Sequence, residues 1–300
     1  MNYHFNMPHT NYHSHCNFCD GTDEPGVYAR AALEQGMIAY GFSSHVPMPF
    51  FCAWSMKAEN LAVYTEQIEK LKLEYKGRLQ IYRSLEIDYI PGLIGPATSF
   101  IKEANLDYTI GSIHFVDRYE NGTHWEIDGT AAIFDDGLQK IFGGDIQNAV
   151  TRYYDLTRMM VREECPDVIG HIDKIKMQNP DSKYFSEDAD WYKTEVLRTL
   201  DVIKGTKAII EVNTRGLYKK KTTEPYPGKW MLGEILKRKI PVMVNSDSHH
   251  PKEITAEFEA TFSLLKEAGF ETVKSFIDNK WQDFKFDKNG LLMPALSHRA

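Results

Sequence analysis

The feature that most constrains this chain is an alternation of short β-branched or aromatic runs with amphipathic helical stretches, repeated from one end to the other. Such an alternation is typical of α/β proteins, in which helices return the chain so that successive strands run parallel. Strands are expected at about 9–15, 38–45, 79–88, 107–115, 167–172, 207–213 and 240–247. Seven strands interleaved with helices predict one closed or nearly closed barrel.

The helices are predicted from apolar residues that recur every three or four positions. Four long helices are expected at about 58–76, 146–164, 190–204 and 253–268, and shorter ones at 26–36, 96–104 and 229–238. The stretch 117–145 is weakly periodic and contains glycines and aspartates, so we expect a loop insertion there. No linker rich in proline, glycine or serine marks a boundary, which favours a single domain over residues 1–300.

Side chains that can bind metal ions fall at the carboxyl ends of the predicted strands. His13 and His15 end the first strand two positions apart, so both imidazoles project to one side. Helices cover the outer face of an α/β barrel, which places the apolar residues of 79–88 outside and Glu86 inside. The other strands end in ligands of the same kinds, namely His45, His114, His171, Asp247 and His249. Imidazoles and carboxylates at one end of one barrel predict a multinuclear site for zinc, manganese or iron.

Composition limits the partners and the compartment. The 35 Lys and Arg residues against 42 Asp and Glu give a formal charge of -7, which disfavours a surface for long nucleic acid or an anionic membrane. Four cysteines are too few for a disulfide framework, and no apolar run approaches the ~20 residues that span a bilayer. We therefore expect a cytoplasmic protein without a membrane segment, and the sequence leaves its oligomeric state open.

A few reactive or charged residues fall outside this pattern. Cys16 and Cys19 form one C-x-x-C pair, which without a second pair favours structural cysteines over a metal site. The basic run 219–221 is more typical of a solvated face than of a phosphate clamp. His124 and His250 are possible substrate contacts, although a surface location is the more common one for such histidines.

Taken in order, the metal-binding residues form the pattern His13-x-His15, Asp20, Gly-Phe-Ser-Ser-His45, Leu-Glu86, Gly-Ser-Ile-His114, Gly-His171-Ile-Asp173 and Asn-Ser-Asp247-Ser-His249. This pattern resembles the polymerase and histidinol phosphatase (PHP) superfamily, specifically its stand-alone histidinol-phosphatase branch, through nearly the whole chain. The resemblance implies a distorted (β/α)7 barrel with its metal site at the carboxyl ends of the strands. It implies a first metal on His13, His15, Glu86 and Asp247, a second on Glu86, His114 and His171, and a third on Asp20, His45 and His249.

The same resemblance implies two to three divalent ions and hydrolysis of L-histidinol phosphate to L-histidinol and phosphate, a step of histidine biosynthesis. A metal-bridging hydroxide would attack phosphorus, and Glu86, Asp247 and His249 would be the catalytic residues. Arg215 lies in a segment similar to one that faces the substrate phosphate in histidinol phosphatases. It is therefore expected to bind the small phosphorylated substrate, with Asn17 and Ser43 as further candidates.

Other functions stay open at this point. A PHP phosphatase or phosphodiesterase acting on nucleotides or phosphotyrosyl protein would use the same metals. A non-catalytic metal-binding barrel is disfavoured because all nine ligand positions are filled, and an amidohydrolase fits the residues Glu86 and Asp247 less well. Acidic side chains of the 117–145 stretch are candidates for the ammonium and imidazole groups of histidinol phosphate. They are Glu120, Glu126, Asp128, Asp135 and Asp136.

Overall fold

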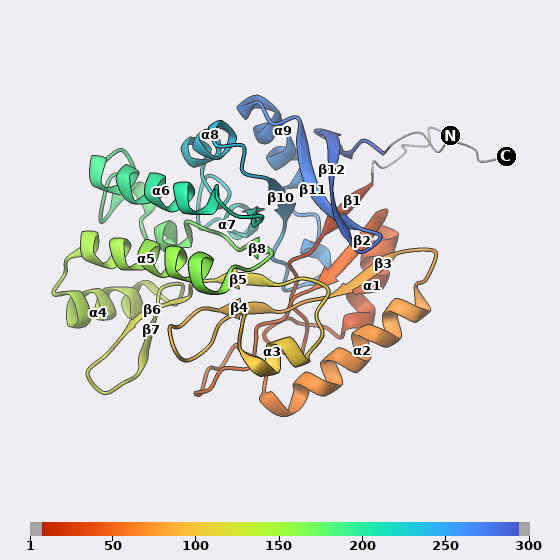
Figure 1. Ribbon diagram of the computed structural model, residues 1–300, viewed down its shortest axis with the longest axis horizontal. Helices are drawn as coiled ribbons and strands as arrows, with labels where there is room; N and C mark the ends of the chain where they lie inside the picture. Colours follow the sequence, from red (N-terminus) through yellow and green to blue (C-terminus); the bar gives the residue numbers. More distant parts are fainter. Residues whose placement is uncertain (1–7, 294–300) are drawn as a thin grey trace.

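The computed structural model describes residues 8–293, and its centre consists of two parallel β-sheets (Figure 1). The first sheet has the order β1 (His9–Asn11), β2 (Met37–Phe42), β3 (Gln80–Arg83). The second has the order β10 (Val242–Asn245), β9 (Ile209–Asn213), β8 (Val168–Ile169), β5 (Ile110–Ser112), β4 (Glu86–Asp88). All neighbouring strands in both sheets run parallel, which confirms the expected α/β class.

The two sheets meet through two single bridges, and they do not close into one continuous ladder within residues 8–293. Ser14, just after β1, bridges Ser248, just after β10. The other bridge joins His45, after the middle strand β2, to Glu86 at the start of β4. Both bridges run parallel and follow the carboxyl ends of β1, β2 and β10, so they bring the predicted metal ligands of both sheets together.

The strand expected over 79–88 is divided into β3 and β4. The backbone N–H of Ser84 still donates to the carbonyl of Phe42 in β2, at 2.7 Å. One residue later the carbonyl of Leu85 accepts from Ile110 in β5, at 3.2 Å. The chain therefore changes its pairing partner from one sheet to the other at this point, and a hydrophobic pattern does not record such a change.

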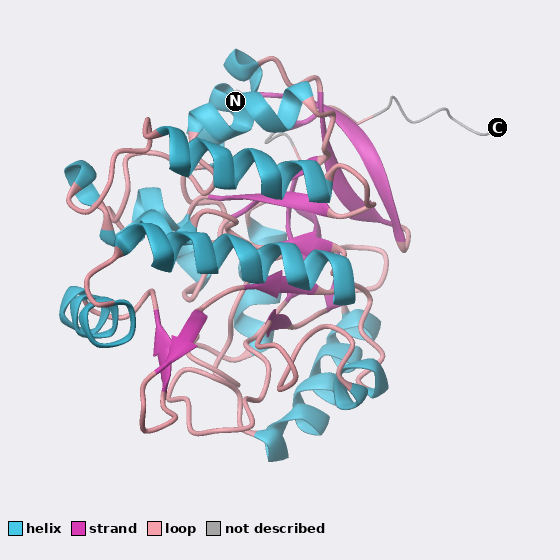
Figure 2. Cartoon of the chain, turned by 60° about the vertical axis from the view of Figure 1, so that its left-hand side comes forward, coloured by secondary structure: helices cyan, strands magenta, loops and turns pink. Residues whose placement is uncertain are grey.

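Helices pack on the outer sides of the sheets (Figure 2). Their residues are α1 (Pro25–Glu34), α2 (Leu61–Glu74), α3 (Ser99–Glu103), α5 (Ile146–Glu164), α6 (Asp190–Ile203), α8 (Lys229–Lys237) and α9 (Phe258–Ala268). The short helix α7 (Arg215–Tyr218) instead follows the carboxyl end of β9. The prediction of a helix over 146–164 is confirmed, and Asp145 caps its first turn by accepting from the backbone N–H of Asn148. Helix α9 begins later than expected because Glu257 has a φ of 60°, which interrupts a right-handed helix.

The stretch 117–145, predicted as a loop insertion, lies between β5 and α5 and contains regular secondary structure. It contains most of an antiparallel hairpin of β6 (Phe115–Arg118) and β7 (His124–Glu126), followed by α4 (Ala131–Phe142). Trp125 of the hairpin is fully buried against α4, and Thr130 caps that helix by accepting from the N–H of Ile133. The sequence is weakly periodic because the hairpin is short.

The last described segment is an antiparallel sheet that the sequence analysis did not assign. It consists of β11 (Thr272–Ile277), β12 (Lys280–Asp287) and β13 (Gly290–Leu291). The hydroxyl of Tyr12 donates to the carbonyl of Phe276 and accepts from its N–H, both at 2.9 Å, which fixes the sheet to the strand that carries His13. No helix within the described ranges has both the length and the apolar character needed to cross a membrane.

Candidate metal centre

The carboxylate of Glu86 lies at the middle of a group of imidazoles. Glu86 is 1% exposed and begins β4. Its Oε2 atom lies 3.2 Å from His13 Nε2, 3.4 Å from His15 Nε2 and 3.1 Å from His45 Nδ1. These three histidines follow β1 and β2, so one oxygen of Glu86 faces the first sheet.

The other oxygen of Glu86 faces the second sheet. Its Oε1 atom lies 2.8 Å from His171 Nε2, just after β8, and 3.5 Å from His114 Nε2, just after β5. It also accepts a hydrogen bond from the hydroxyl of Ser112, at 2.7 Å. Glu86 thus presents one carboxylate oxygen to each of two histidine groups, which is the arrangement of a bridging ligand.

Two further carboxylates complete the centre. Asp247 Oδ1 lies 3.2 Å from His15 Nε2 and 3.6 Å from His249 Nδ1. Asp247 has a φ of 51°, a left-handed conformation that is uncommon for a residue other than glycine and is often found at functional sites. Asp20 Oδ2 lies 3.1 Å from His249 Nε2, and Asp20 Oδ1 lies 3.9 Å from His45 Nε2.

The donor atoms fit divalent metal ions. Ring nitrogens of five predicted ligands, and of His9 outside the centre, are buried without a hydrogen-bond partner within residues 8–293, and a buried polar atom without a partner is costly. In the centre these atoms are His13 Nε2, His15 Nε2, His45 Nδ1, His114 Nε2 and His171 Nδ1. Imidazole nitrogen and carboxylate oxygen are the ligands that zinc accepts in catalytic sites. Four overlapping groups have ligand atoms within 4.8 Å of one another, namely His15, Asp20, His45 and His249; His13, His15 and Asp247; His45, Asp88 and His114; and Glu86, His114 and His171.

Carboxylates behind the imidazoles fix their orientation. Glu211 Oε1 lies 2.6 Å from His13 Nδ1, and its Oε2 accepts from the backbone N–H of His171 at 2.9 Å. Asp88 Oδ1 lies 2.9 Å from His114 Nδ1. A carboxylate on the second ring nitrogen orients a metal-binding histidine and makes it more basic. Neither carboxylate was predicted from the sequence to have a role in the site, although Asp88 shares a strand face with Glu86.

Burial and neighbouring charges shift the pKa values of the groups in the centre in different directions. Burial and the adjacent His249 lower the pKa of His15 to about 4, so its ring is neutral. Burial alone would raise the pKa of Glu86 and Asp247, but the nearby positive charge outweighs it and holds both well below the usual range. Burial opposes the charged form of His13, yet the neighbouring carboxylates, Glu211 first among them, raise its pKa well above the ordinary value.

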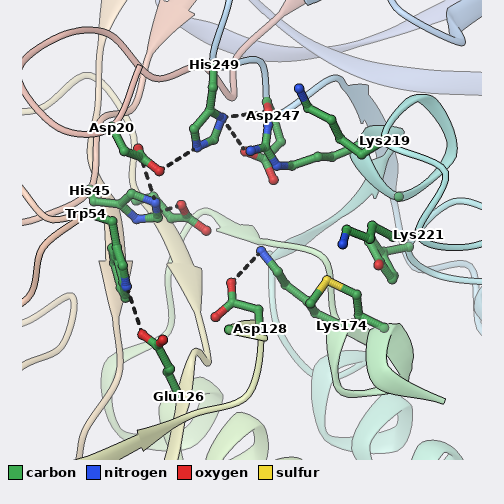
Figure 3. A pocket seen from close by; sticks show the side chains of 16 residues that line it. Asp20, His45, Trp54, Glu126, Asp128, Lys174, Lys219, Lys221, Asp247 and His249 are labelled. Carbon is green, nitrogen blue, oxygen red and sulfur yellow. Dashed lines mark hydrogen bonds and ion pairs between the residues drawn. The ribbon is translucent and has the colours of Figure 1, made fainter. Parts of the chain in front are cut away.

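A pocket of about 360 Å³ opens above the centre, and Figure 3 shows the side chains that line it. Asp20, His45, Glu86, Asp247 and His249 form its metal-binding part. On another side lie cationic residues, namely Lys174, Arg215, Lys219 and Lys221. The basic run 219–221 is exposed, as expected, but two of its lysines border this pocket.

Arg215 is the predicted substrate-binding residue that the structure places in the pocket. Its Nη1 donates to the carbonyl of Asp247 at 2.9 Å and to the hydroxyl of Tyr218 at 3.2 Å. Burial disfavours the charged form of Arg215, but the negative charge of Asp247 outweighs that effect. The pKa of Arg215 therefore lies above its usual value. Arg215 is therefore a fixed cation beside the candidate metal ligands.

The other two predicted substrate contacts lie outside the pocket. Ser43 is fully buried, and its hydroxyl accepts from the backbone N–H of Ser14 at 3.0 Å, so it holds β1 and β2 together. Asn17 is exposed and does not line the pocket. The structure therefore does not bring Ser43 and Asn17 into this pocket, because a short polar residue near a metal ligand in sequence need not face the same way.

The remaining outlying residues have local structural roles. Cys19 Sγ lies 3.5 Å from His15 Nδ1, while Cys16 is buried with its Sγ 3.3 Å from the hydroxyl of Ser44. His124 stacks on Phe50 outside the metal-binding pocket, with ring centroids 4.6 Å apart. His250 accepts from the N–H of Lys252 at 3.1 Å and so caps a short helical turn.

Fold and site together define an α/β protein with a buried histidine and carboxylate centre suited to several metal ions. The chain belongs to the PHP domain family, whose model matches residues 10–215, and the expected superfamily is thereby confirmed. A probable histidinol-phosphatase of Deinococcus radiodurans is 30% identical over 267 residues, covering 87% of this chain and 94% of that protein.

A second relative and a solved structure are also similar to this chain. A histidinol-phosphatase of Bacillus subtilis is 27% identical over 268 residues, covering 83% of this chain and 96% of the relative. The crystal structure of histidinol phosphate phosphatase from Lactococcus lactis, complexed with zinc, L-histidinol and phosphate, superposes with a TM-score of 0.66 at 20% identity. That match covers 95% of this chain and 99% of the other, so the two proteins share a fold along almost their whole length.

Proposed function

We propose that this chain is a metal-dependent phosphomonoesterase that hydrolyses L-histidinol phosphate, with water, to L-histidinol and inorganic phosphate. The observation that carries the proposal is the convergence of imidazoles from both sheets on the two oxygens of Glu86, beside the cation of Arg215. A phosphomonoester is a dianion, and such a site neutralises its charge. The substrate is supported by relatives named histidinol-phosphatase that match more than four-fifths of this chain.

Two to three divalent ions, zinc, manganese or iron, are the cofactors of this proposal. The nine predicted ligands would hold a first ion on His13, His15, Glu86 and Asp247, a second on Glu86, His114 and His171, and a third on Asp20, His45 and His249. Four of the unpaired ring nitrogens face Glu86 and support this assignment, since each needs a partner. They belong to His13, His15, His45 and His114. When bound, such ions polarise phosphate oxygens and lower the pKa of a water molecule toward neutrality.

The protein's own groups have distinct parts in the reaction. Glu86 fixes the distance between the two histidine groups, because each of its carboxylate oxygens contacts one of the groups. Nη1 of Arg215 is held by the carbonyl of Asp247. Its Nε and Nη2 groups have no hydrogen-bond partner among residues 8–293 and are free to orient a phosphate oxygen. Asp247 and His249 border the pocket 3.6 Å apart and are the groups placed to hold or move a proton there.

The finer architecture and the compartment belong to the same proposal. We take the strands as a distorted (β/α)7 barrel that forms one domain, supported by the bridges from Ser14 to Ser248 and from His45 to Glu86, which join the two sheets. A cytoplasmic location is supported by the four cysteines, all of which are free thiols.

Release of inorganic phosphate tests the proposal directly. Protein of measured metal content is assayed with L-histidinol phosphate, a nucleoside monophosphate and phosphotyrosine. The proposal predicts at least roughly a hundredfold higher kcat/KM for histidinol phosphate, the discrimination expected when a site binds polar groups that the competitor lacks. Equal values would overturn the substrate assignment and favour a general PHP phosphatase, while no release from any ester by the metal-loaded protein would overturn the phosphatase function.

A further inference from the structure

Apart from the metal-binding side, acidic residues line the pocket on the wall that comes from the hairpin β6–β7 and the turn that follows it. Five acidic residues of this region were candidates for contacting a cationic substrate. Their ion pairs and their positions relative to the pocket distinguish them. Asp135 pairs with Lys183 at 3.4 Å and Asp136 with Lys140 at 2.8 Å, and neither lines the pocket. Glu120 is exposed and also lies outside the pocket lining.

Two acidic residues of the region do line the pocket, and only one of them has a cation beside it. Asp128 forms an ion pair with the ammonium of Lys174 at 3.0 Å, so the negative charge of Asp128 is already neutralised. Glu126 has no Lys, Arg or His side chain within ion-pair distance among residues 8–293, and it is half-buried. Glu126 is therefore an anionic group in the pocket whose charge is available to a ligand.

Trp54 holds the carboxylate of Glu126 at a set position relative to the metal centre. The indole Nε1 donates to Glu126 Oε2 at 3.0 Å. The indole ring is fixed between His45, with ring centroids 4.4 Å apart, and Phe115, on which it stacks at 5.6 Å. Glu126 thus lies about one indole ring away from a candidate metal ligand, on the opposite side of the pocket from Asp247 and His249 (Figure 3).

The second oxygen of Glu126 is left open by a glycine. A Cβ atom on Gly129 would come within 2.7 Å of Glu126 Oε1, so a larger residue there would crowd the carboxylate. Oε2 is used by Trp54, and Oε1 is the oxygen that remains for a ligand. The cations Lys219 and Lys221 lie across the pocket from this wall (Figure 3).

We propose that Glu126, positioned by Trp54, binds the cationic part of the leaving group and so selects phosphomonoesters whose alcohol carries an ammonium or imidazolium. The proposal rests on the phosphatase function proposed above. The phosphoryl group lies at the metal-binding side, where Arg215 supplies positive charge, and the alcohol points toward Glu126. One pocket then recognises the two opposite charges of its substrate at two opposite walls.

The test compares substrates that differ in the charge of the leaving group. The quantity measured is the ratio of kcat/KM for L-histidinol phosphate to kcat/KM for p-nitrophenyl phosphate, whose leaving group has no cation. Glu126→Gln keeps the size of the side chain and removes its charge. It is expected to lower this ratio about tenfold, mainly through KM, the order expected when a half-exposed charge-assisted hydrogen bond is lost. Glu120→Gln, an exposed residue of the same hairpin, is the matched control and is expected to leave the ratio unchanged.

Trp54→Phe tests the positioning role separately. It removes the indole donor while keeping an aromatic ring against His45, and it is expected to lower the same ratio by a smaller factor. In the Trp54→Phe background, Glu126→Gln is expected to have less effect than in the wild type, because the two residues act through one contact.

The outcomes separate this inference from the function on which it rests. If the wild type prefers histidinol phosphate and Glu126→Gln with normal metal content keeps that preference, Glu126 does not select the leaving group and the inference is overturned. If the wild type hydrolyses both esters equally well, the proposed substrate fails, and the inference fails with it. A tenfold loss of preference in Glu126→Gln, with Glu120→Gln unchanged, supports both.

Discussion

His13 Nδ1 and Glu211 Oε1 lie 2.6 Å apart, and both side chains are fully buried. This contact turns the opposite nitrogen of the same imidazole toward Glu86, at 3.2 Å. Glu211 also accepts from the side-chain amide of Asn245 at 2.9 Å, so strands β9 and β10 hold the ring that follows β1. The candidate metal centre is therefore built on a carboxylate that does not belong to its ligand set.

Replacing Glu211 with glutamine is expected to weaken metal binding about 10- to 100-fold, the usual effect of removing a partner of a metal-binding histidine. Metal content after dialysis against a graded chelator measures this. Glu195→Gln is the matched control, because Glu195 is also buried but pairs with Arg158, at 2.7 Å, on the outer helices. Equal metal affinity in Glu211→Gln and the wild type would show that Glu211 does not position His13.

Glu86→Gln removes the charge shared by the two histidine groups while keeping the volume of the side chain. We expect turnover to fall at least about 100-fold and metal content to fall with it, because removing the charge of a ligand weakens the binding of every ion that this ligand contacts. The assay is phosphate release alongside elemental analysis of the same sample. Near-normal turnover with intact metal content would refute the bridging role.

Arg215→Ala is expected to lower kcat/KM for the phosphomonoester roughly 10- to 100-fold, which corresponds to the loss of a charge-assisted hydrogen bond. Metal content is expected to stay the same, since Arg215 contacts Asp247 through the backbone carbonyl. Arg198→Ala, whose side chain is 61% exposed, is the control for a lost cation. Steady-state kinetics that do not distinguish the two variants would remove Arg215 from the phosphate site.

Gly137→Ala tests the packing of the hairpin that supplies the acidic wall. A Cβ atom at this position would come within 2.1 Å of the Trp125 ring, so the variant is expected to lose about 1–3 kcal/mol of unfolding free energy. Gly233 in α8 has open space around its Cβ position, and Gly233→Ala is expected to gain up to ~1 kcal/mol from helix propensity. Urea unfolding measures both, and equal stability changes would contradict this account of the packing.

Much of the fold and most of the site could be predicted from the sequence, because they depend on local periodicity. The apolar stripe over 146–164 matches α5, and Ala149, Tyr153 and Met160 of that stripe are buried. The histidines and carboxylates at the strand ends meet because carboxyl ends of parallel strands share one edge, a rule that needs no knowledge of distant contacts. His13 and Glu86 illustrate this, since they are 3.2 Å apart in space although their strands lie far apart in sequence.

What could not be predicted depends on long-range contacts. The change of pairing at Ser84 and Leu85 follows from where β2 and β5 lie, which local sequence does not encode. The hairpin β6–β7 and the sheet β11–β12–β13 are short or solvent-facing elements whose patterns are weak. Glu211 appeared as one acidic residue among 42 Asp and Glu, and only its contact with His13 identifies its role.

The position of bound metal tests the central claim most directly. Crystals of the zinc-loaded protein, measured at the zinc absorption edge, are predicted to show two or three anomalous peaks around Glu86. Each peak is expected at about 2.0–2.1 Å from histidine nitrogens of the centre, His13 and His171 among them. Peaks confined to other parts of the molecule, or none at Glu86 in protein that releases phosphate from L-histidinol phosphate, would contradict the account.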